Sequence, residues 1–142
     1  MLIIVKNNIN EISRVCDIVR KFCEEHNVSN EKCHDITLIL DEIITNIVNY
    51  AYPDNKEHEL SVDIDKIGVH ITLRLVDSGI AFDPLAQADP DVESSLEERK
   101  VGGLGIFIAK QLSDELKYSR INGQNQLDIR VAIYSEGKDN GN

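Results

Sequence analysis

Three polar residues share one side of a predicted helix in the first half of the chain. Glu42, Asn46 and Asn49 stand four and three positions apart, so a helix places them in line. Apolar neighbours such as Ile43 and Ile47 indicate that this helix packs against a core. We therefore expect the polar line to border a pocket, where a carboxylate and a carboxamide one turn apart can contact two parts of one ligand. The alternative is a solvated helix face, since amphipathic helices are common.

A second polar signal stands where a predicted strand ends. Asp77 follows an apolar run that closes with Val76, and Gly79 comes two residues later. A carboxylate in this position can point into a cleft while a glycine lets the backbone turn tightly away. Because a carboxylate only accepts hydrogen bonds, it suits an exocyclic amine. The alternative is an ordinary Asp-Ser-Gly turn.

A third signal is glycine-rich and stands directly before another predicted helix. Its residues are Gly102, Gly103, Leu104 and Gly105. Glycines let backbone N–H groups approach an anion, and a helix N-terminus adds free donors and partial positive charge, so this segment suits a phosphate. It is neither a Walker loop nor a dinucleotide-binding fingerprint, because the residues that complete those motifs are missing.

Hydrophobic periodicity predicts the elements that must position these residues. A strand at 2–5 precedes a helix with Asn8 as N-cap and Glu11 in a capping box, broken at 26–27. A longer helix with Ser29 as N-cap runs to about Tyr52, ahead of Pro53. The remaining predicted elements are a hairpin over 60–76 that turns at Gly68, a long loop over 77–103, a helix from 104 to about 115, and a hairpin over 116–134 that turns at Asn122-Gly123.

This order predicts an α+β fold: a two-layer α/β sandwich with a mostly antiparallel, mixed sheet and helices on one face. Polar residues on predicted strands, such as Thr72 and Arg74, indicate that the other face is at least partly wet. We expect one domain over residues 1–134 and a polar tail over 135–142.

Composition narrows the classes of function. The 142 residues carry a net charge of −10, which disfavours nucleic acid and anionic membranes as partners. No apolar run approaches the roughly 20 residues that cross a bilayer, and a signal peptide is not evident, so we expect a cytoplasmic protein. Three cysteines, Cys16, Cys23 and Cys33, show neither a zinc-site spacing nor an even count, and we interpret them as reduced.

Taken together, the three signals resemble a known set. Glu42-x-x-x-Asn46, Asp77-x-Gly79 and Gly103-x-Gly105 look like the N, G1 and G2 boxes of the GHKL ATP-binding superfamily, which includes gyrase, the heat-shock chaperone ATPase, histidine kinases and mismatch-repair proteins. Residues 41–52 and the Asp-x-Gly-x-x-Phe-Asp-Pro form of 77–84 are most similar to the stand-alone anti-sigma-factor serine kinases of bacterial partner switches. The resemblance implies a Bergerat-type fold.

It also implies roles for individual residues. Asp77 would accept a hydrogen bond from the adenine amino group, and Gly79 would let the backbone pass beneath the ring. Asn46 would hold Mg²⁺ on the phosphates of ATP, with Asn49 nearby. Glu42 would be the general base that takes the proton from a serine or threonine hydroxyl. The other nucleotide-binding residues that the resemblance implies are Phe82, Gly103, Leu104 and Gly105, together with Arg99 and Lys100 in a lid over about 86–102.

One feature of the superfamily has no match here. A small hydroxyl residue on a sheet strand commonly supports the adenine contact, but residues 127–130 read Leu-Asp-Ile-Arg. The acidic lid, in addition, holds a single basic pair, Arg99 and Lys100.

The resemblance predicts an ATP-dependent serine/threonine kinase that phosphorylates a STAS-type anti-sigma antagonist and binds a sigma factor, with a homodimer expected by analogy. Two alternatives stay open. One is a nucleotide-dependent interaction module without turnover. The other is the ATPase domain of a histidine kinase acting apart from its phosphoacceptor; against it, residues 1–26 supply one strand and one helix of the domain, which leaves no second helix for a dimerising hairpin.

Overall fold

Helices and strands follow one another in the predicted order. A computed structural model describes residues 1–86 and 103–133 of the chain. The elements are β1 (Leu2–Lys6), α1 (Glu11–Glu25), α2 (Asn30–Tyr50), β2 (Glu59–Ile67), β3 (His70–Asp77), the 3₁₀ turn η1 (Pro84–Ala86), α3 (Gly103–Leu112), β4 (Glu115–Ile121) and β5 (Gln124–Ala132). The expected loop over 77–103 thus contains η1, and most of the expected lid, 87–102, lies outside the described residues.

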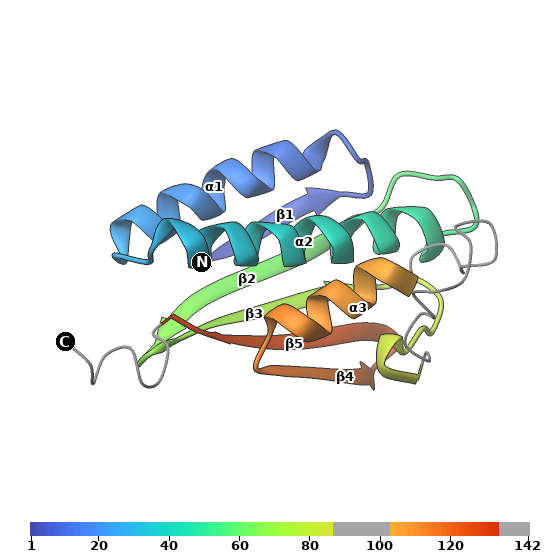
Figure 1. The fold of residues 1–142 in the computed structure, drawn as a ribbon. Coiled ribbons are helices and arrows are strands. Elements are labelled where there is room, and N and C mark those ends of the chain that lie inside the picture. Colours follow the sequence, from blue (N-terminus) through green and yellow to red (C-terminus); the bar gives the residue numbers. More distant parts are fainter. Residues whose placement is uncertain (87–102, 134–142) are drawn as a thin grey trace.

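The five strands form one sheet in the order β1-β2-β3-β5-β4. All four pairings among these strands are antiparallel, so the described sheet is antiparallel throughout and not mixed. Two of the pairings, β2 with β3 and β4 with β5, are hairpins, which join antiparallel strands directly. The three helices cover one face of the sheet, with α1 over the β1 side and α3 over the β5 side (Figure 1). The expected two-layer α+β fold is confirmed.

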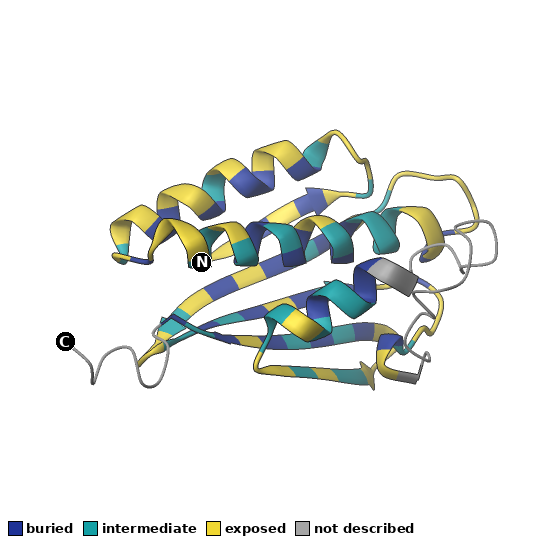
Figure 2. Ribbon diagram, viewed as in Figure 1, coloured by how far each residue is buried: buried dark blue, intermediate teal, exposed yellow. Residues whose placement is uncertain are grey.

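The core lies between the helices and the sheet. Alternate strand residues turn toward the helices and are buried, whereas their neighbours are exposed, which gives the banded pattern of Figure 2. Ile64, Leu73 and Ile129 are paired across β2, β3 and β5 and are almost fully buried. Ile36, Leu40 and related residues of α2 complete this layer.

The opposite face of the sheet is polar, as expected. Arg74 of β3 and Asp128 of β5 are register partners there and form an ion pair of 2.7 Å. A sheet face without a covering layer must remain polar to face water. Within the described residues, no helix has both the length and the apolar character that a membrane crossing requires.

Two helix ends differ from the sequence prediction. The N-cap position of α1 is Asn10, without a side-chain capping bond, and the capping box at Asn8 is therefore wrong. Asn8 instead accepts from Asn10 N through its side chain, and Glu11 accepts from Lys6 N, so both stabilise the turn before the helix. The helix α2 ends at Tyr50, two residues before the predicted end. Ser29 is its N-cap, as predicted, and its hydroxyl accepts from Lys32 N at 3.2 Å.

The turn between β4 and β5 is the predicted Asn122-Gly123. Both residues have positive φ, 52° and 76°. Such angles match a two-residue turn to the right-handed twist of a hairpin. This turn fixes the register of β4 against β5, in which Arg120 faces Asn125 and Tyr118 faces Leu127.

Candidate nucleotide site

A cavity opens where the end of α2, the ends of β3 and β5, and α3 converge. The space that it leaves for the centres of water-sized molecules is about 50 Å³, and it is partly open to solvent. Its polar lining residues are Asn46, Asp77, Tyr118 and Asn125. The rest of its wall is Ile43, Ile47, Tyr50, Ala51, Leu75, Phe82, Pro84, Ile106 and Leu127. A mainly apolar cavity with a few polar groups suits a flat aromatic ring that carries polar edges.

Asp77 is the acceptor of this cavity. Its side chain is 6% exposed, and its Oδ1 accepts from Gly79 N at 2.9 Å and from Asn125 Nδ2 at 3.0 Å. In the described part of the chain, no donor contacts Oδ2. A buried carboxylate is costly unless its oxygens receive hydrogen bonds, so Oδ2 is available to a ligand donor such as an exocyclic amine.

Gly79 is required by its contact with α2. A Cβ at this position would collide with the backbone carbonyl of Ala51, directly after the helix. The same carbonyl accepts from Ile80 N at 2.9 Å, and Arg120 donates to Gly79 O at 2.9 Å. The turn after β3 is therefore held against the end of α2, and this close approach is a reason for glycine that the sequence did not reveal.

The polar line of α2 divides into three environments. Asn46 lines the cavity, and its Nδ2 is buried without a hydrogen-bond partner among the described residues. Glu42, one turn earlier, lies outside the cavity lining and is half-buried. Asn49 is exposed and does not line the cavity. The structure therefore brings Asn46 together with Asp77 and Phe82, whereas Asn49 stays on the solvent side of the helix.

Glu42 contacts the first turn of α3. A Cβ on Gly105 would fall against the Glu42 carboxylate, so glycine here leaves room for that group. Burial, and secondly the charge of Asp41, raise the pKa of Glu42 above its ordinary value. Gly103, Leu104 and Gly105 are the first three residues of α3, whose N-terminal amides lack intrahelical partners. A carboxylate with a raised pKa thus lies beside a helix end that attracts anions.

The two basic residues expected at the phosphates, Arg99 and Lys100, lie outside the described residues. Among the described residues, no cluster of three or more His, Cys, Asp or Glu could hold a metal ion. A metal at this site would therefore depend on ligand phosphates together with a group such as the Asn46 carboxamide. Mg²⁺ is commonly bound in that way, through few protein ligands plus substrate phosphates and water. The unpartnered atom of Asn46 is Nδ2, a hydrogen donor that suits a phosphate oxygen, whereas the carboxamide oxygen is the atom that would hold the cation.

The sequence prediction missed Asn125 and Tyr118. The sequence comparison aligned the superfamily's hydroxyl position with residues 127–130, but the β5 residue opposite Asp77 is Asn125. It is 7% exposed, and Tyr118 donates to its Oδ1 at 2.6 Å. The sequence pattern of β5 could have revealed Asn125. Buried and more exposed residues alternate along this strand, and Asn125 lies on the same buried side as Leu127, Ile129 and Val131.

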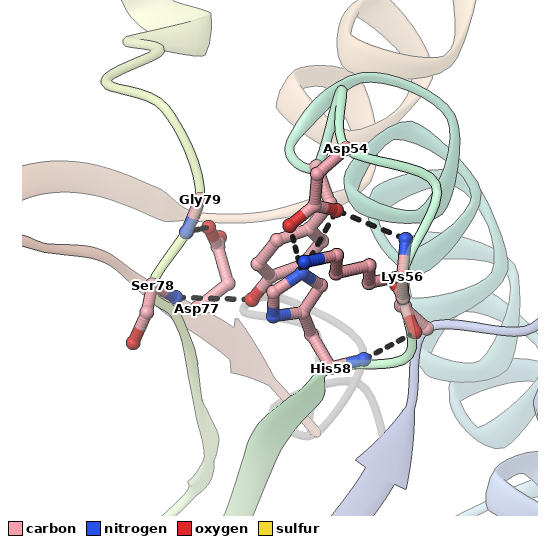
Figure 3. A network of polar contacts seen from close by, with 8 residues as sticks. Asp54, Lys56, His58, Asp77, Ser78 and Gly79 are labelled. Carbon is pink, nitrogen blue, oxygen red and sulfur yellow. Dashed lines mark hydrogen bonds and ion pairs between the residues drawn. The ribbon is translucent and has the colours of Figure 1, made fainter.

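A second polar network supports the turn from outside the cavity (Figure 3). Tyr52 accepts from Ser78 N at 3.0 Å, and its ring stacks on His58 with centroids 4.1 Å apart. His58 in turn contacts the Asp54 carboxylate at 2.8 Å. The segment between α2 and β2 is in this way joined to the turn that carries Asp77.

Comparisons with known proteins show the family and the fold of this chain. Residues 5–131 match the family described as the histidine kinase-like ATPase domain. The serine-protein kinase RsbW of Oceanobacillus iheyensis is 32% identical over 111 residues, which cover 75% of this chain and 68% of that protein. The serine/threonine-protein kinase BtrW of Bordetella bronchiseptica is 28% identical over 94 residues, 66% of either chain.

Solved structures show the same fold. The crystal structure of the RsbU and RsbW domains of a Mycobacterium tuberculosis protein superimposes with a TM-score of 0.69 at 16% identity, over 94% of this chain and 32% of that one. The Acinetobacter baumannii histidine kinase AdeS gives a TM-score of 0.52 at 14% identity, over 95% of this chain and 68% of that one. The chain spans about two thirds of the length of the curated relatives it matches.

Proposed function

Because this chain belongs to the histidine kinase-like ATPase domain family, we propose that it binds ATP with Mg²⁺ and transfers the γ-phosphate to a serine or threonine of a partner protein. The observation that carries the proposal is a pair of side-chain atoms on one cavity without a partner among the described residues, next to a carboxylate one helical turn away. The pair is Oδ2 of Asp77 and Nδ2 of Asn46, and the carboxylate is that of Glu42 beside α3. Similarity to serine-protein kinases supports the type of acceptor.

The proposed roles are divided among residues of α2, the end of β3 and the start of α3. Asp77 accepts from the adenine amino group. The Asn46 carboxamide oxygen would hold Mg²⁺, for which it is a suitable ligand. Mg²⁺, when bound, supplies positive charge that offsets the charge of the transferring phosphoryl group. Gly103, Gly105 and the N-terminal amides of α3 receive the phosphates, with Arg99 and Lys100 as further candidates and Leu104 between the glycines.

Glu42 acts on the acceptor side. It removes the proton from the incoming serine or threonine hydroxyl as the oxygen attacks the γ-phosphate, and ADP leaves. Burial raises the pKa of this carboxylate, which makes it a stronger proton acceptor than an exposed glutamate. Its place one helical turn from Asn46 puts the base and the phosphate contacts on one helix face.

The resemblance to anti-sigma-factor kinases leads us to propose a STAS-type anti-sigma antagonist as the phosphoacceptor, with a sigma factor and a second copy of the chain as further partners. Asn49 is exposed on α2, so in this proposal it would approach the phosphates of ATP from the solvent side.

The test is phosphate transfer from labelled ATP to a STAS-domain protein encoded beside this chain. We expect Glu42→Gln to lower transfer by about 100-fold or more, the usual range for loss of a general base, while ATP affinity changes little. Glu31→Gln is the matched control, because it makes the same chemical change at an exposed position in the first turn of α2.

The outcomes separate the alternatives. Transfer that survives Glu42→Gln removes Glu42 from the mechanism. If the wild-type protein binds ATP and captures the partner in a nucleotide-dependent manner, yet transfers no phosphate, the chain is an interaction module and the kinase proposal fails.

A further inference from the structure

Asn125 is the most densely bonded side chain at the cavity. Its Oδ1 accepts from Tyr118 Oη at 2.6 Å and from Phe82 N at 3.3 Å. Its Nδ2 donates to Ile80 O at 2.8 Å and to Asp77 Oδ1 at 3.0 Å. A carboxamide has two donor hydrogens and two acceptor lone pairs, so every hydrogen-bonding position of Asn125 is used inside the protein.

The backbone contacts determine which end of this amide is which. Phe82 N can only donate, and Ile80 O can only accept, so an amide rotated by half a turn would place like groups against both. With Nδ2 in place, its second hydrogen points to Asp77 Oδ1, which also accepts from Gly79 N. That oxygen of Asp77 therefore accepts two hydrogen bonds within the protein.

The same logic determines the direction of the Tyr118 hydroxyl. Because Asn125 Oδ1 cannot donate, Tyr118 must give its hydrogen to that oxygen. The Tyr118 oxygen then presents only lone pairs to other groups. Both Tyr118 and Asp77 line the cavity. The Tyr118 oxygen and Oδ1 of Asp77 are therefore both held as acceptors at this part of the wall.

We propose that Asn125 is a positioning residue that sets the base preference of the cavity: by holding Asp77 and Tyr118 as acceptors, it selects a purine with an exocyclic amine and disfavours a 6-oxopurine. A 6-oxo group would bring its own lone pairs against the acceptors of this wall. The inference rests on the proposed nucleotide binding and adds the residues that govern which base is taken. It also assigns to a carboxamide the place where the superfamily commonly uses a small hydroxyl residue.

The test compares the affinities for ATP and for inosine triphosphate (ITP), which carries oxygen in place of the amino group, by calorimetry with Mg²⁺. We expect the wild-type protein to prefer ATP by about tenfold or more, since a site built to hydrogen-bond an amine disfavours the analogue that lacks it. In Tyr118→Phe, which removes one acceptor and keeps the ring, this preference should fall by about threefold or more.

Asn125→Asp gives a second readout that a merely structural role would not move. The introduced carboxylate would contact Asp77, and two carboxylates this close share one proton. We expect ATP affinity relative to the wild type to be lowest near pH 8 and to recover by about tenfold or more toward pH 6, as the shared proton binds. Gln126→Glu is the control, because it adds the same charge one residue along β5 on the other side of the sheet.

An ATP-to-ITP preference unchanged within about twofold in Tyr118→Phe would overturn the inference, as would an ATP affinity of Asn125→Asp that follows the wild type at every pH. If Asn125→Asp does not fold, which far-ultraviolet circular dichroism reports, the Tyr118→Phe comparison decides alone. Absence of ATP and ITP binding to the wild-type protein would refute the proposed function instead.

Discussion

At the scale of the residue, the site depends on positions where no side chain fits. A Cβ on Gly79 would meet the backbone of Ala51, and a Cβ on Gly105 would meet the carboxylate of Glu42. These obstacles differ in kind, because a backbone carbonyl at a helix end cannot move away, whereas a glutamate side chain can change rotamer. The two glycines should therefore respond differently to the same substitution.

We expect Gly79→Ala to lower the free energy of unfolding by about 1–3 kcal/mol, the usual cost of forcing an atom into a packed region. The turn must move away from Ala51 and break the bond from Ile80 N. Urea unfolding measures the loss. Gly105→Ala is the comparison: alanine gains about 1 kcal/mol of helix propensity over glycine, which offsets displacement of the carboxylate. Equal losses in the two variants would contradict this account.

The raised pKa of Glu42 predicts a pH-dependent stability. Burial disfavours the ionised form in the folded protein, while the unfolded chain has the ordinary pKa of 4.5. The folded state therefore loses stability as the pH rises from 4.5 through the folded-state pKa. Without nucleotide, Glu42→Gln should raise the thermal midpoint near pH 7 and have almost no effect near pH 4. A gain of the same size at both pH values would exclude the ionisation of Glu42 as its cause.

At the scale of the element, α2 carries both core and site. Its 21 residues bury Ile36, Leu40 and Ile44 against the sheet while Asn46 reaches the cavity. The carbonyl after its last turn, that of Ala51, accepts from Ile80 in the turn that follows Asp77. A shift of α2 along its own axis would consequently change the placement of Asn46 relative to Asp77.

The N-cap of α2 provides a test of what holds this helix. We expect Ser29→Ala to cost about 1 kcal/mol of stability, since Lys32 N loses its acceptor. Asn10→Ala is the matched control, because Asn10 occupies the N-cap position of α1 without a side-chain capping bond. Its effect should stay below about 0.5 kcal/mol. Chemical denaturation of the two variants measures both, and a larger loss for Asn10→Ala would overturn the assignment.

At the scale of the whole molecule, both the helix layer and the sheet contribute residues to the cavity. Its walls come from α2, β3, α3, β4 and β5, so a ligand in it contacts most of the fold at once. The chain also carries a net charge of −10, which opposes a polyanionic ligand unless a cation accompanies it. Binding should therefore be linked both to global stability and to the metal.

We expect ATP with Mg²⁺ to stabilise the protein by about 2.7 kcal/mol when the nucleotide is at 100 times its Kd, and much less when a chelator removes the metal. Thermal unfolding monitored by fluorescence or calorimetry measures the shift. In Asn46→Ala, the part of the ATP stabilisation that depends on the metal should be lost. Asn49→Ala, one turn farther along α2 and exposed, should retain most of it. Identical shifts with and without the chelator would exclude Mg²⁺ from binding.

The sequence by itself determined the order of the elements, the Asn122-Gly123 turn, the Ser29 cap and the three motifs that the site uses, because periodicity and turn chemistry act over a few neighbouring residues. Only the tertiary structure decided that Asn125 contacts Asp77, 48 residues away, that Gly79 abuts Ala51, and that Asn49 stays exposed. The physical reason is that these contacts depend on the register of β3 against β5 and on the packing of helix ends against turns. Such distances are set when the layers assemble, and no short stretch of sequence records them.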